Sequence, residues 1–506
     1  MSANRGPHVG GLHVHAGFGT ALRSVSRVAK ARSADDVAAI VEYARREGLT
    51  IAARGSGRSY GDAANLDRGL VLDMLGMNRV HDWNPIDGIM TCEPGLTIEG
   101  LWRRSLEDGY WPAVVPGTMA PTLGGCLSTN IHGKNNFAVG SFGEHVLDFE
   151  LITAAGERLH CSRTSNTDVF HAVIGGMGLL GVVTKMRLKL GRVGSGYLHV
   201  RPLVGRSLDE MFDLFERHVP ESNYLVGWMD CTVGGGSLGR GLIHRANYVS
   251  AEEDPTEGRS LNVERQVLPA KILGVPKALI WRLMRPWTND FGVRIVNSAK
   301  YFASRMSRSK PYLQSHVAFA FLLDYIPNWK LAYGPGGLIQ HQIFVPAATA
   351  RVAFRDVLRL TQKRGFPSYL GVMKRHRPDP FLLTHALDGY SLALDFSVKD
   401  STRAALWNVT AEMTDIVLAA GGNFYFAKDS VLRAGDVVAG YGSERLGQFF
   451  ALKRKLDPES RFATELSRRV FVEPSPNLGA NARSMLAENP CIGIDAASVR
   501  RDLGGA

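Results

Sequence analysis

The chain has 506 residues, enough for two or three domains, and 45% of them are hydrophobic, so it can bury a sizeable core. Its five scattered cysteines form no CxxC pair, and no stretch reads as a secretory signal or a membrane span, so we expect a reducing, cytoplasmic setting with neither a zinc site nor a disulfide framework. The net charge of +11 comes without a nucleic-acid recognition motif, so no nucleic-acid partner is expected.

The first predicted element is a helix that starts after Ser33, where Asp36 replaces the Glu or Gln of a capping box, and ends at Gly48. Strands are expected at 50–53, 70–74 and 89–92, a helix at 97–108, a hairpin of strands at 149–154 and 159–161, a helix at 168–174 and a half-buried strand at 182–190. Beyond residue 195 we expect strands at 315–325, 338–345, 390–396 and 423–427, and a helix at 401–420. This irregular mixture predicts an α+β fold.

A glycine-rich loop follows the strand at 50–53, with the sequence Ala53-Arg54-Gly55-Ser56-Gly57-Arg58-Ser59-Tyr60-Gly61-Asp62. Glycine lets the backbone approach a ligand closely, and successive N–H groups in such a turn can form an anion-binding nest. The loop is therefore predicted to hold a phosphate. A GxGxxG motif stands at Gly176–Gly181, but a predicted helix precedes it and a strand follows it, the reverse of a Rossmann unit.

One segment, residues 265–310, carries ten Lys and Arg residues against a single acid, Asp290, and interleaves them with Trp, Leu and Ile. Basic and apolar residues in this arrangement suit the surface of an anionic membrane. The equally weighted alternative is a solvated basic face over an ordinary core, because a run of charge alone is weak evidence.

Small-residue loops at 116–125 and 132–143 accompany the first loop, as expected for one long ligand held between two subdomains. Together, these loops resemble the vanillyl-alcohol-oxidase-type flavoproteins. The segments that show this resemblance are Arg54–Ser59 after the strand at 50–53, Pro116-Gly117-Thr118, Thr122-Leu123-Gly124-Gly125 and Ile174–Thr184. The resemblance implies a two-subdomain PCMH-type FAD-binding domain, which surrounds FAD with glycine loops and contains no Rossmann unit.

Within these flavoproteins, the chain resembles the decaprenylphosphoryl-β-D-ribose 2′-oxidase family most closely, from about residue 25 to residue 470. The motifs are Ile131-His132-Gly133-Lys134-Asn135, Ser141-Phe142-Gly143, Leu238-Gly239-Arg240, Ala332–Gly337, Ala427-Lys428-Asp429-Ser430 and Asp457-Pro458 with Ser467-Arg468-Arg469. The implied organisation is an FAD-binding domain at 15–193, a substrate (cap) domain built on an antiparallel sheet at 194–400, a segment at 401–470 that completes the substrate side and returns to the FAD domain, and a disordered tail at 471–506.

The resemblance also implies the residues that contact FAD. They are Ala53, Arg54, Gly55, Ser56, Gly57, Arg58, Ser59, Tyr60, Gly61, Pro116, Gly117, Thr118, Thr122, Gly124, Gly125, Asn130, His132, Gly133, Asn135, Gly181, Val183 and Tyr425. Many related flavoenzymes attach the flavin through a histidine at the position of Arg58. Arginine cannot form that bond, so we expect non-covalent FAD and no metal.

Three residues are carried over as catalytic: Lys428, His132 and Gln342. Lys428 can act as a base or can stabilise a developing alkoxide, and the sequence leaves the choice open. Taken without the resemblance, Lys428 reads as a surface ion pair with Asp429, His132 as a core histidine, and Gln342 as a residue facing solvent.

The implied reaction is oxidation of the 2′-hydroxyl of a polyprenyl-phosphate-linked ribose to a ketone, with an NAD(P)H-dependent short-chain reductase as partner completing an epimerisation to arabinose. We expect the enzyme at the inner face of the membrane, docked through residues 265–310. Two departures from the family put the exact substrate in doubt: Ala393 replaces a cysteine, and Ala320 stands where an aromatic residue is expected. The alternatives are an aldonolactone or alditol oxidase acting on a soluble sugar, and a flavin-free binding protein.

Overall fold

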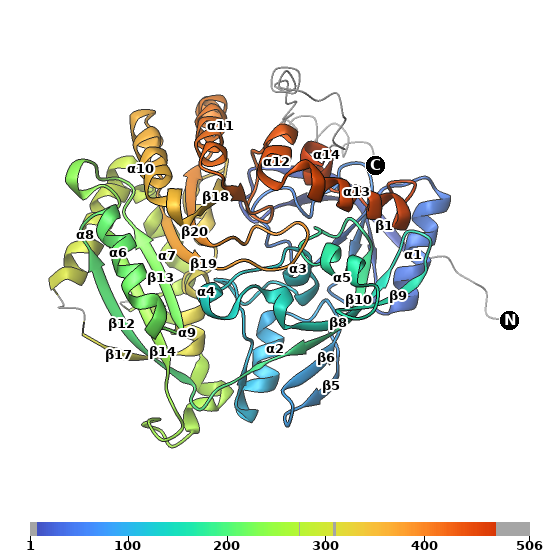
Figure 1. The fold of residues 1–506 in the computed structure, drawn as a ribbon, viewed down its shortest axis with the longest axis horizontal. Helices are drawn as coiled ribbons and strands as arrows, with labels where there is room; N and C mark the ends of the chain where they lie inside the picture. The colour runs from blue at the N-terminus through green and yellow to red at the C-terminus, as the bar shows by residue number, and fades with distance from the viewer. Residues whose placement is uncertain (1–7, 273, 307–309, 472–506) are drawn as a thin grey trace.

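The computed structural model describes residues 8–272, 274–306 and 310–471. Figure 1 shows an N-terminal part on the right, built on two smaller sheets, and a part on the left built on one large sheet. The predicted tail therefore lies outside the described residues from residue 472 onward, as do residues 307–309 of the basic segment.

The first sheet has the strand order β1-β2-β4-β3 and combines an antiparallel β1–β2 pair with parallel pairs of β4 to β2 and β3. Helix α1 (Ala34–Arg46) begins where predicted, because the Ser33 hydroxyl accepts a hydrogen bond from the Asp36 N–H. The strands are β1 (Val9–Ala16), β2 (Arg23–Lys30), β3 (Ile51–Arg54) and β4 (Leu70–Asp73).

The second sheet is antiparallel, in the order β5-β6-β10-β8-β9. Its strands are β5 (Val80–Asn84), β6 (Ile89–Cys92), β8 (Val146–Ile152), β9 (Arg158–Ser162) and β10 (Val182–Lys189). Helix α5 (Thr167–Val173) precedes the GxGxxG turn and the half-buried β10 follows it, which confirms the predicted helix–strand order. The intervening short elements are α2 (Ile98–Ser105), a 3-10 helix (Leu106–Asp108), β7 (Tyr110–Trp111), α3 (Leu123–Ser128), α4 (Asn136–Val139) and β11 (Gly191–Arg192).

The large sheet has eight strands, and every pairing within it is antiparallel. In sheet order they are β17 (Tyr312–Ser315), β12 (Tyr197–Gly205), β14 (Gly241–Tyr248), β13 (Tyr224–Met229), β19 (Gly371–His376), β20 (Gly389–Ser397), β18 (Leu338–Pro346) and β21 (Asn423–Phe424). Helices α6 (Leu208–His218), α10 (Ala347–Lys363) and α11 (Arg403–Ala419) pack on this sheet. The mixed helix and antiparallel-sheet architecture agrees with the predicted α+β class.

Two predicted strands were wrong or too long. Residues 315–325 form helix α9 (His316–Ala320) and a 3-10 helix (Leu322–Asp324), because the Ser315 hydroxyl caps α9 by accepting from the Ala318 N–H. A short apolar run suits a buried helix as well as a strand, and here the hydrogen bond from the Ala318 N–H to Ser315 favours the helix. The strand expected at 423–427 stops at Phe424, and the backbone then turns.

The remaining elements join the two parts. A hairpin of β15 (Lys271–Ile272) and β16 (Val275–Pro276) leads into α7 (Lys277–Met284) and α8 (Asp290–Met306), which lies at the left of Figure 1. At the C-terminal end, α12 (Ala434–Tyr441), α13 (Ser443–Leu456) and α14 (Glu465–Val470) return to the N-terminal part, where Ile51 exchanges backbone hydrogen bonds with residues 461–463.

Candidate active site

A cavity of about 680 Å³ lies between the two smaller sheets and the large sheet. The glycine loop and the two other small-residue loops line one side of it. Strands β13, β14, β18, β19 and β20 line the other side with alternate side chains, since successive strand residues point to opposite faces. Val226 and Trp228 of β13 thus face the cavity, whereas Leu225, the residue before Val226, is fully buried in the core.

The glycine loop presents free backbone donors to this cavity. None of the N–H groups from Gly55 to Ser59 has a hydrogen-bond acceptor among the described residues, and all five residues line the cavity. A Cβ atom on Gly55 would lie 2.0 Å from the Thr122 hydroxyl, so only glycine allows this approach to α3. Such a row of unpaired N–H groups suits the pyrophosphate of FAD.

Arg54 holds the loop in place through hydrogen bonds, and it forms no ion pair among the described residues. Its guanidinium donates to the carbonyl oxygens of Ala16 and Ala64 and to the side chain of Asn65, at 2.6–3.0 Å. Gly57 packs against it with φ +63°, where a Cβ would meet Arg54 Nη2 at 2.3 Å. Arg58, in contrast, is exposed and stacks over the Phe18 ring at 5.7 Å.

Most of the predicted FAD residues line the cavity, and four do not. Those that line it are Ala53, Arg54, Gly55, Ser56, Gly57, Arg58, Ser59, Tyr60, Pro116, Gly117, Thr118, Thr122, Gly124, Gly125, His132, Gly181, Val183 and Tyr425. The other four pack behind this wall: Gly61 lies against the backbone of Asp429, Gly133 against Asn135 and Val115, and Asn135 donates to the Ala113 carbonyl.

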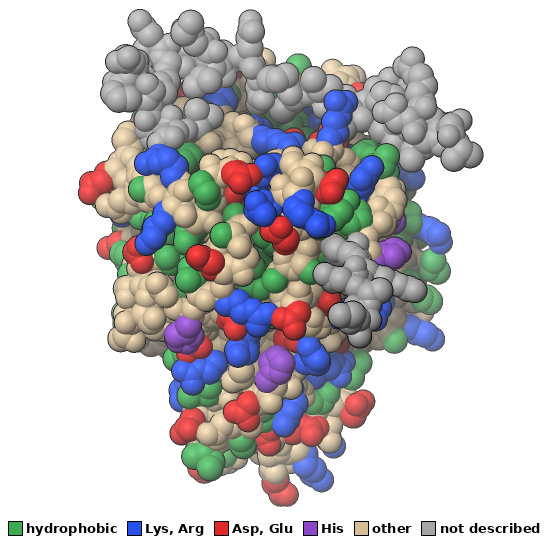
Figure 2. Space-filling view, turned by 90° about the vertical axis from the view of Figure 1, so that its right-hand side faces the viewer, with side chains coloured by type: hydrophobic (Ala, Val, Ile, Leu, Met, Phe, Trp, Pro, Cys, Tyr) green, Lys and Arg blue, Asp and Glu red, His purple; other side chains and the backbone are tan. Residues whose placement is uncertain are grey.

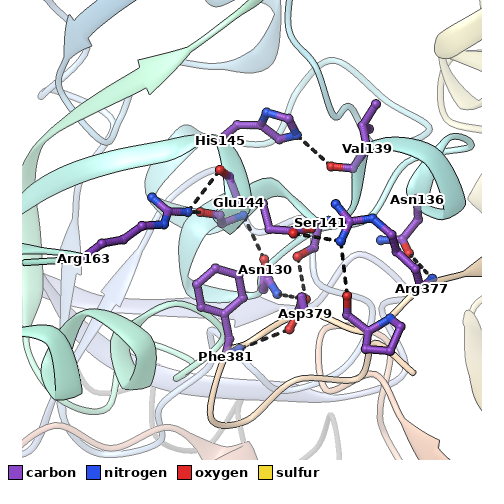
Figure 3. Close-up of polar contacts among 12 residues, drawn as sticks. Asn130, Asn136, Val139, Ser141, Glu144, His145, Arg163, Arg377, Asp379 and Phe381 are labelled. Carbon is purple, nitrogen blue, oxygen red and sulfur yellow. Dashed lines mark hydrogen bonds and ion pairs between the residues drawn. The ribbon is translucent and has the colours of Figure 1, made fainter. Parts of the chain in front are cut away.

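The fourth, Asn130, belongs to a polar network that supports the loop of His132 (Figure 3). Its amide donates to Asp379 at 2.9 Å and its oxygen accepts from the Gly143 N–H, while the Ser141 hydroxyl also donates to Asp379. An ion pair of Arg377 with Glu144 at 2.9 Å and a bond from the Arg377 N–H to Asn136 complete the connection to the segment after β19. The network fixes the His132 loop against the large sheet.

His132 lies in a cluster of polar residues that line one wall of the cavity, together with Gln342, Lys374 and Lys428. We call this cluster the floor of the cavity. The Nε2 of His132 lies 2.9 Å from the side-chain nitrogen of Gln342, and its Nδ1 lies 3.4 Å from Lys374 Nζ. Burial, followed by the charge of Lys374, holds the pKa of His132 well below its usual range, so the ring is neutral at pH 7. Gln342 is buried beside it, which excludes the alternative of a solvent-facing residue.

Lys428 reaches into the same floor. Its Nζ lies 3.7 Å from the centroid of the Tyr60 ring, and burial lowers its pKa from 10.5 to about 7, partly opposed by the nearby carboxylate of Asp395. Asp429 does not form the surface ion pair considered above. Its carboxylate binds Arg469 at 2.8 Å, and Arg469 also binds Asp62 beside the glycine loop.

Two lysines among the cavity residues, Lys374 and Lys300, were not predicted as site residues. Lys374 stands in a strand without a motif, and Lys300 was noted only as part of the basic segment. With Arg54, Arg58, Lys134 and Lys428 they make six basic side chains, and no Asp or Glu lines the cavity within the described part of the chain. Such a lining suits an anionic ligand.

The cavity also has apolar lining residues. They are Met284, Leu322, Leu323, Ile326, Trp329, Leu370 and Val372. Of the two departures from the family, Ala393 lines the cavity, whereas Ala320 lines a small neighbouring pocket with Phe319 and Lys134. No group of three His, Cys, Asp or Glu side chains that could hold a metal occurs in the described ranges.

Comparison with known proteins adds independent findings. Residues 25–162 match the family model of an FAD binding domain. The chain is 31% identical over 458 residues to decaprenylphosphoryl-β-D-ribose oxidase of Mycolicibacterium smegmatis, which covers 88% of this chain and 96% of that enzyme. It is 29% identical to an uncharacterized protein of Streptomyces coelicolor, over 74% of this chain and all of that protein. It is also 30% identical to cytokinin dehydrogenase 2 of Arabidopsis thaliana, over 31% of this chain and 32% of that enzyme.

Proposed function

Because this chain belongs to the family of FAD-dependent oxidoreductases that contains decaprenylphosphoryl-β-D-ribose oxidase, we propose that it oxidises the 2′-hydroxyl of a polyprenyl-phosphate-linked ribose to a ketone. The family, the FAD cofactor and the enzyme class predicted from the sequence are thereby confirmed. The substrate, the reacting hydroxyl and the residue roles are proposals.

One observation supports this substrate most strongly. The cavity wall opposite the FAD loops combines lysines with apolar side chains and contains no Asp or Glu among the described residues. A sugar that carries both a phosphate and a hydrocarbon chain matches both properties, because the lysines attract the phosphate and the apolar lining residues accommodate the chain. A free sugar or lactone has neither group, so the soluble-sugar alternative leaves these features without a role.

Oxidation of an alcohol removes a proton from oxygen and a hydride from carbon, and FAD when bound supplies the hydride acceptor. We assign the proton to Lys428, whose lowered pKa of about 7 leaves much of it neutral and able to accept at pH 7. Lys374 keeps its positive charge to a higher pH, with a pKa of about 8, and can stabilise negative charge on the reacting oxygen. His132 and Gln342 orient the sugar by hydrogen bonds.

The test is anaerobic bleaching of the flavin absorbance by candidate substrates. A short-chain polyprenylphosphoryl ribose should bleach the flavin, whereas ribose, alditols and aldonolactones at the same concentration should not. Bleaching by a free sugar alone would overturn the proposed substrate. Acid precipitation is the accompanying control for the cofactor: since arginine at position 58 cannot attach the flavin, all FAD should appear in the supernatant.

The product ketone would then be reduced at the same carbon by an NAD(P)H-dependent short-chain reductase, which is the partner that an epimerisation to arabinose requires. Supplying such a reductase should convert the ketone to the arabinose derivative. Accumulation of the ketone alone in its presence would argue against this partner.

The surface of α7 and α8 supports docking at an anionic membrane. Large apolar side chains are exposed here beside Arg and Lys, including Phe291 (73% exposed), Leu283 (58%) and Trp287 (50%), so the alternative of a basic face over buried apolar residues does not describe this surface. By contrast, Figure 2 shows acidic and basic side chains interspersed over the face at the right of Figure 1. Within residues 8–272, 274–306 and 310–471, no helix has the length and apolar character needed to span a bilayer.

Co-sedimentation with vesicles tests this docking. We expect binding to vesicles that contain anionic lipid, weakened by salt, and less binding for a Phe291→Ser, Leu283→Ser double variant. Failure to bind such vesicles at low salt would refute the docking while leaving the oxidation reaction untouched.

A further inference from the structure

Lys300 is an unusual member of the basic segment because it points into the cavity. It lies on α8, and its Nζ sits 4.1 Å from the ring centroid of Trp228, which also lines the cavity. Among the described residues, this ammonium group has no carboxylate partner and no hydrogen-bond acceptor. The side chain is exposed in part, and desolvation of the ammonium group lowers its pKa to about 8, so it is still mostly charged at pH 7.

Lys134 is a second basic residue that lines the same cavity. Lys134 follows His132 by two residues, and its Nζ donates to the Phe319 carbonyl and lies 4.5 Å from the Phe319 ring centroid. It also has no carboxylate partner within the described ranges. Burial lowers the pKa of Lys134 to about 7, so a bound anion would favour its charged form, whereas Lys300 is partly open to solvent and is already charged.

His244 of β14 lies near both of these lysines. It is directly opposite Val226 in the sheet, lines the cavity, and is close enough to both Lys300 and Lys134 for their charges to lower its pKa further, to about 4, beyond the effect of burial. The imidazole is therefore neutral at pH 7 and can donate one N–H to an anion without adding charge. The three side chains come from α8, the His132 loop and β14, so the large sheet and the loop must be assembled to bring them together.

This group is distinct from the floor around Lys428. In the sheet order, β14 lies four strands from β18, which carries Gln342, a backbone separation of about 19 Å at about 4.8 Å per strand. Lys134, two residues after His132 in the same loop, connects the two groups, because the charge of Lys374 is close enough to lower its pKa. Met284, the last residue of α7, belongs to the apolar lining of the same cavity.

We propose that Lys300, Lys134 and His244 form the subsite for the phosphate of the substrate, and that α8 supplies Lys300 to it. This inference rests on the proposed function for the identity of the ligand. It adds that α8 serves two purposes: its outer face presents apolar and basic side chains to solvent, and its inner face contributes a cation to the substrate cavity. The polyprenyl chain then leaves the phosphate along the apolar lining of the cavity.

The test measures binding of farnesyl phosphate and farnesol to the FAD-loaded enzyme by isothermal titration calorimetry, so it does not depend on turnover. Lys300→Met keeps the length of the side chain over Trp228 and removes the charge, whereas Lys300→Arg keeps the charge. We expect Lys300→Met to weaken farnesyl phosphate binding at least about tenfold, as for the loss of one charge-assisted hydrogen bond, with farnesol binding unchanged and Lys300→Arg close to wild type.

Arg294→Met is the matched control, because Arg294 is an exposed base on the same helix that does not line the cavity. It should leave farnesyl phosphate binding unchanged. The proposal is overturned if Lys300→Met binds farnesyl phosphate as wild type does, if it loses farnesol equally, or if it loses only anionic-vesicle binding, which would place Lys300 in the membrane surface. Farnesyl phosphate binding that depends on Lys300 in an enzyme that oxidises no phosphoryl ribose would retain the subsite and reject only the proposed reaction.

Discussion

Lowering the pH should switch off substrate oxidation by protonating Lys428. A lysine is neutral, and able to accept a proton, only above its pKa. Burial places that pKa at about 7, well below the ordinary 10.5. With this value, the neutral fraction is about 99% at pH 9 and about 1% at pH 5, so the rate constant of flavin reduction should fall about 100-fold between them. An ordinary lysine would instead give a rate still rising at pH 10.

Two substitutions should move this transition in opposite directions. Lys374→Met removes a charge that lowers the pKa of Lys428, so the transition should move to higher pH. Asp395→Asn removes a carboxylate that raises the same pKa, so the transition should move to lower pH. His132 contributes no transition in this range, because its pKa lies far below its usual value.

The assay is stopped-flow reduction of the flavin under anaerobic conditions, at saturating polyprenylphosphoryl ribose and from pH 5 to pH 9. A rate that rises as the pH falls would refute the base role and would indicate that charged Lys428 stabilises the alkoxide. A transition that both substitutions leave in place would belong to another group.

Two further predictions concern how the site is held together. Gly55→Ala should weaken FAD binding at least about tenfold in equilibrium dialysis, because the new Cβ would lie 2.0 Å from the Thr122 hydroxyl. The control is Gly435→Ala, which has open space around its Cβ and should bind FAD normally. Arg469→Met should destabilise the protein by about 3–5 kcal/mol in urea unfolding, because it leaves two buried carboxylates without their partner, and a loss below about 1 kcal/mol would contradict this.

Local sequence patterns predicted the elements with strong local signals. The cap at Ser33 and the alternation of β10 depend on residues within the element itself, and both are found as predicted. The strand expected at 315–325 failed because the apolar run alone does not distinguish a strand from a buried helix. Asn130 illustrates the same limit in the site: its loop was identified, but its partner Asp379 is 249 residues away.

The sequence by itself determined the family, the FAD cofactor and the glycine loop, because each depends on residues that are neighbours along the chain. Only the tertiary structure decided the electrostatics of the cavity. Lys374 and Lys428 come from two distant segments, and their pKa values are lowered because the assembled fold removes them from water. Such desolvation has no counterpart in a linear motif, since it depends on which distant segments pack together.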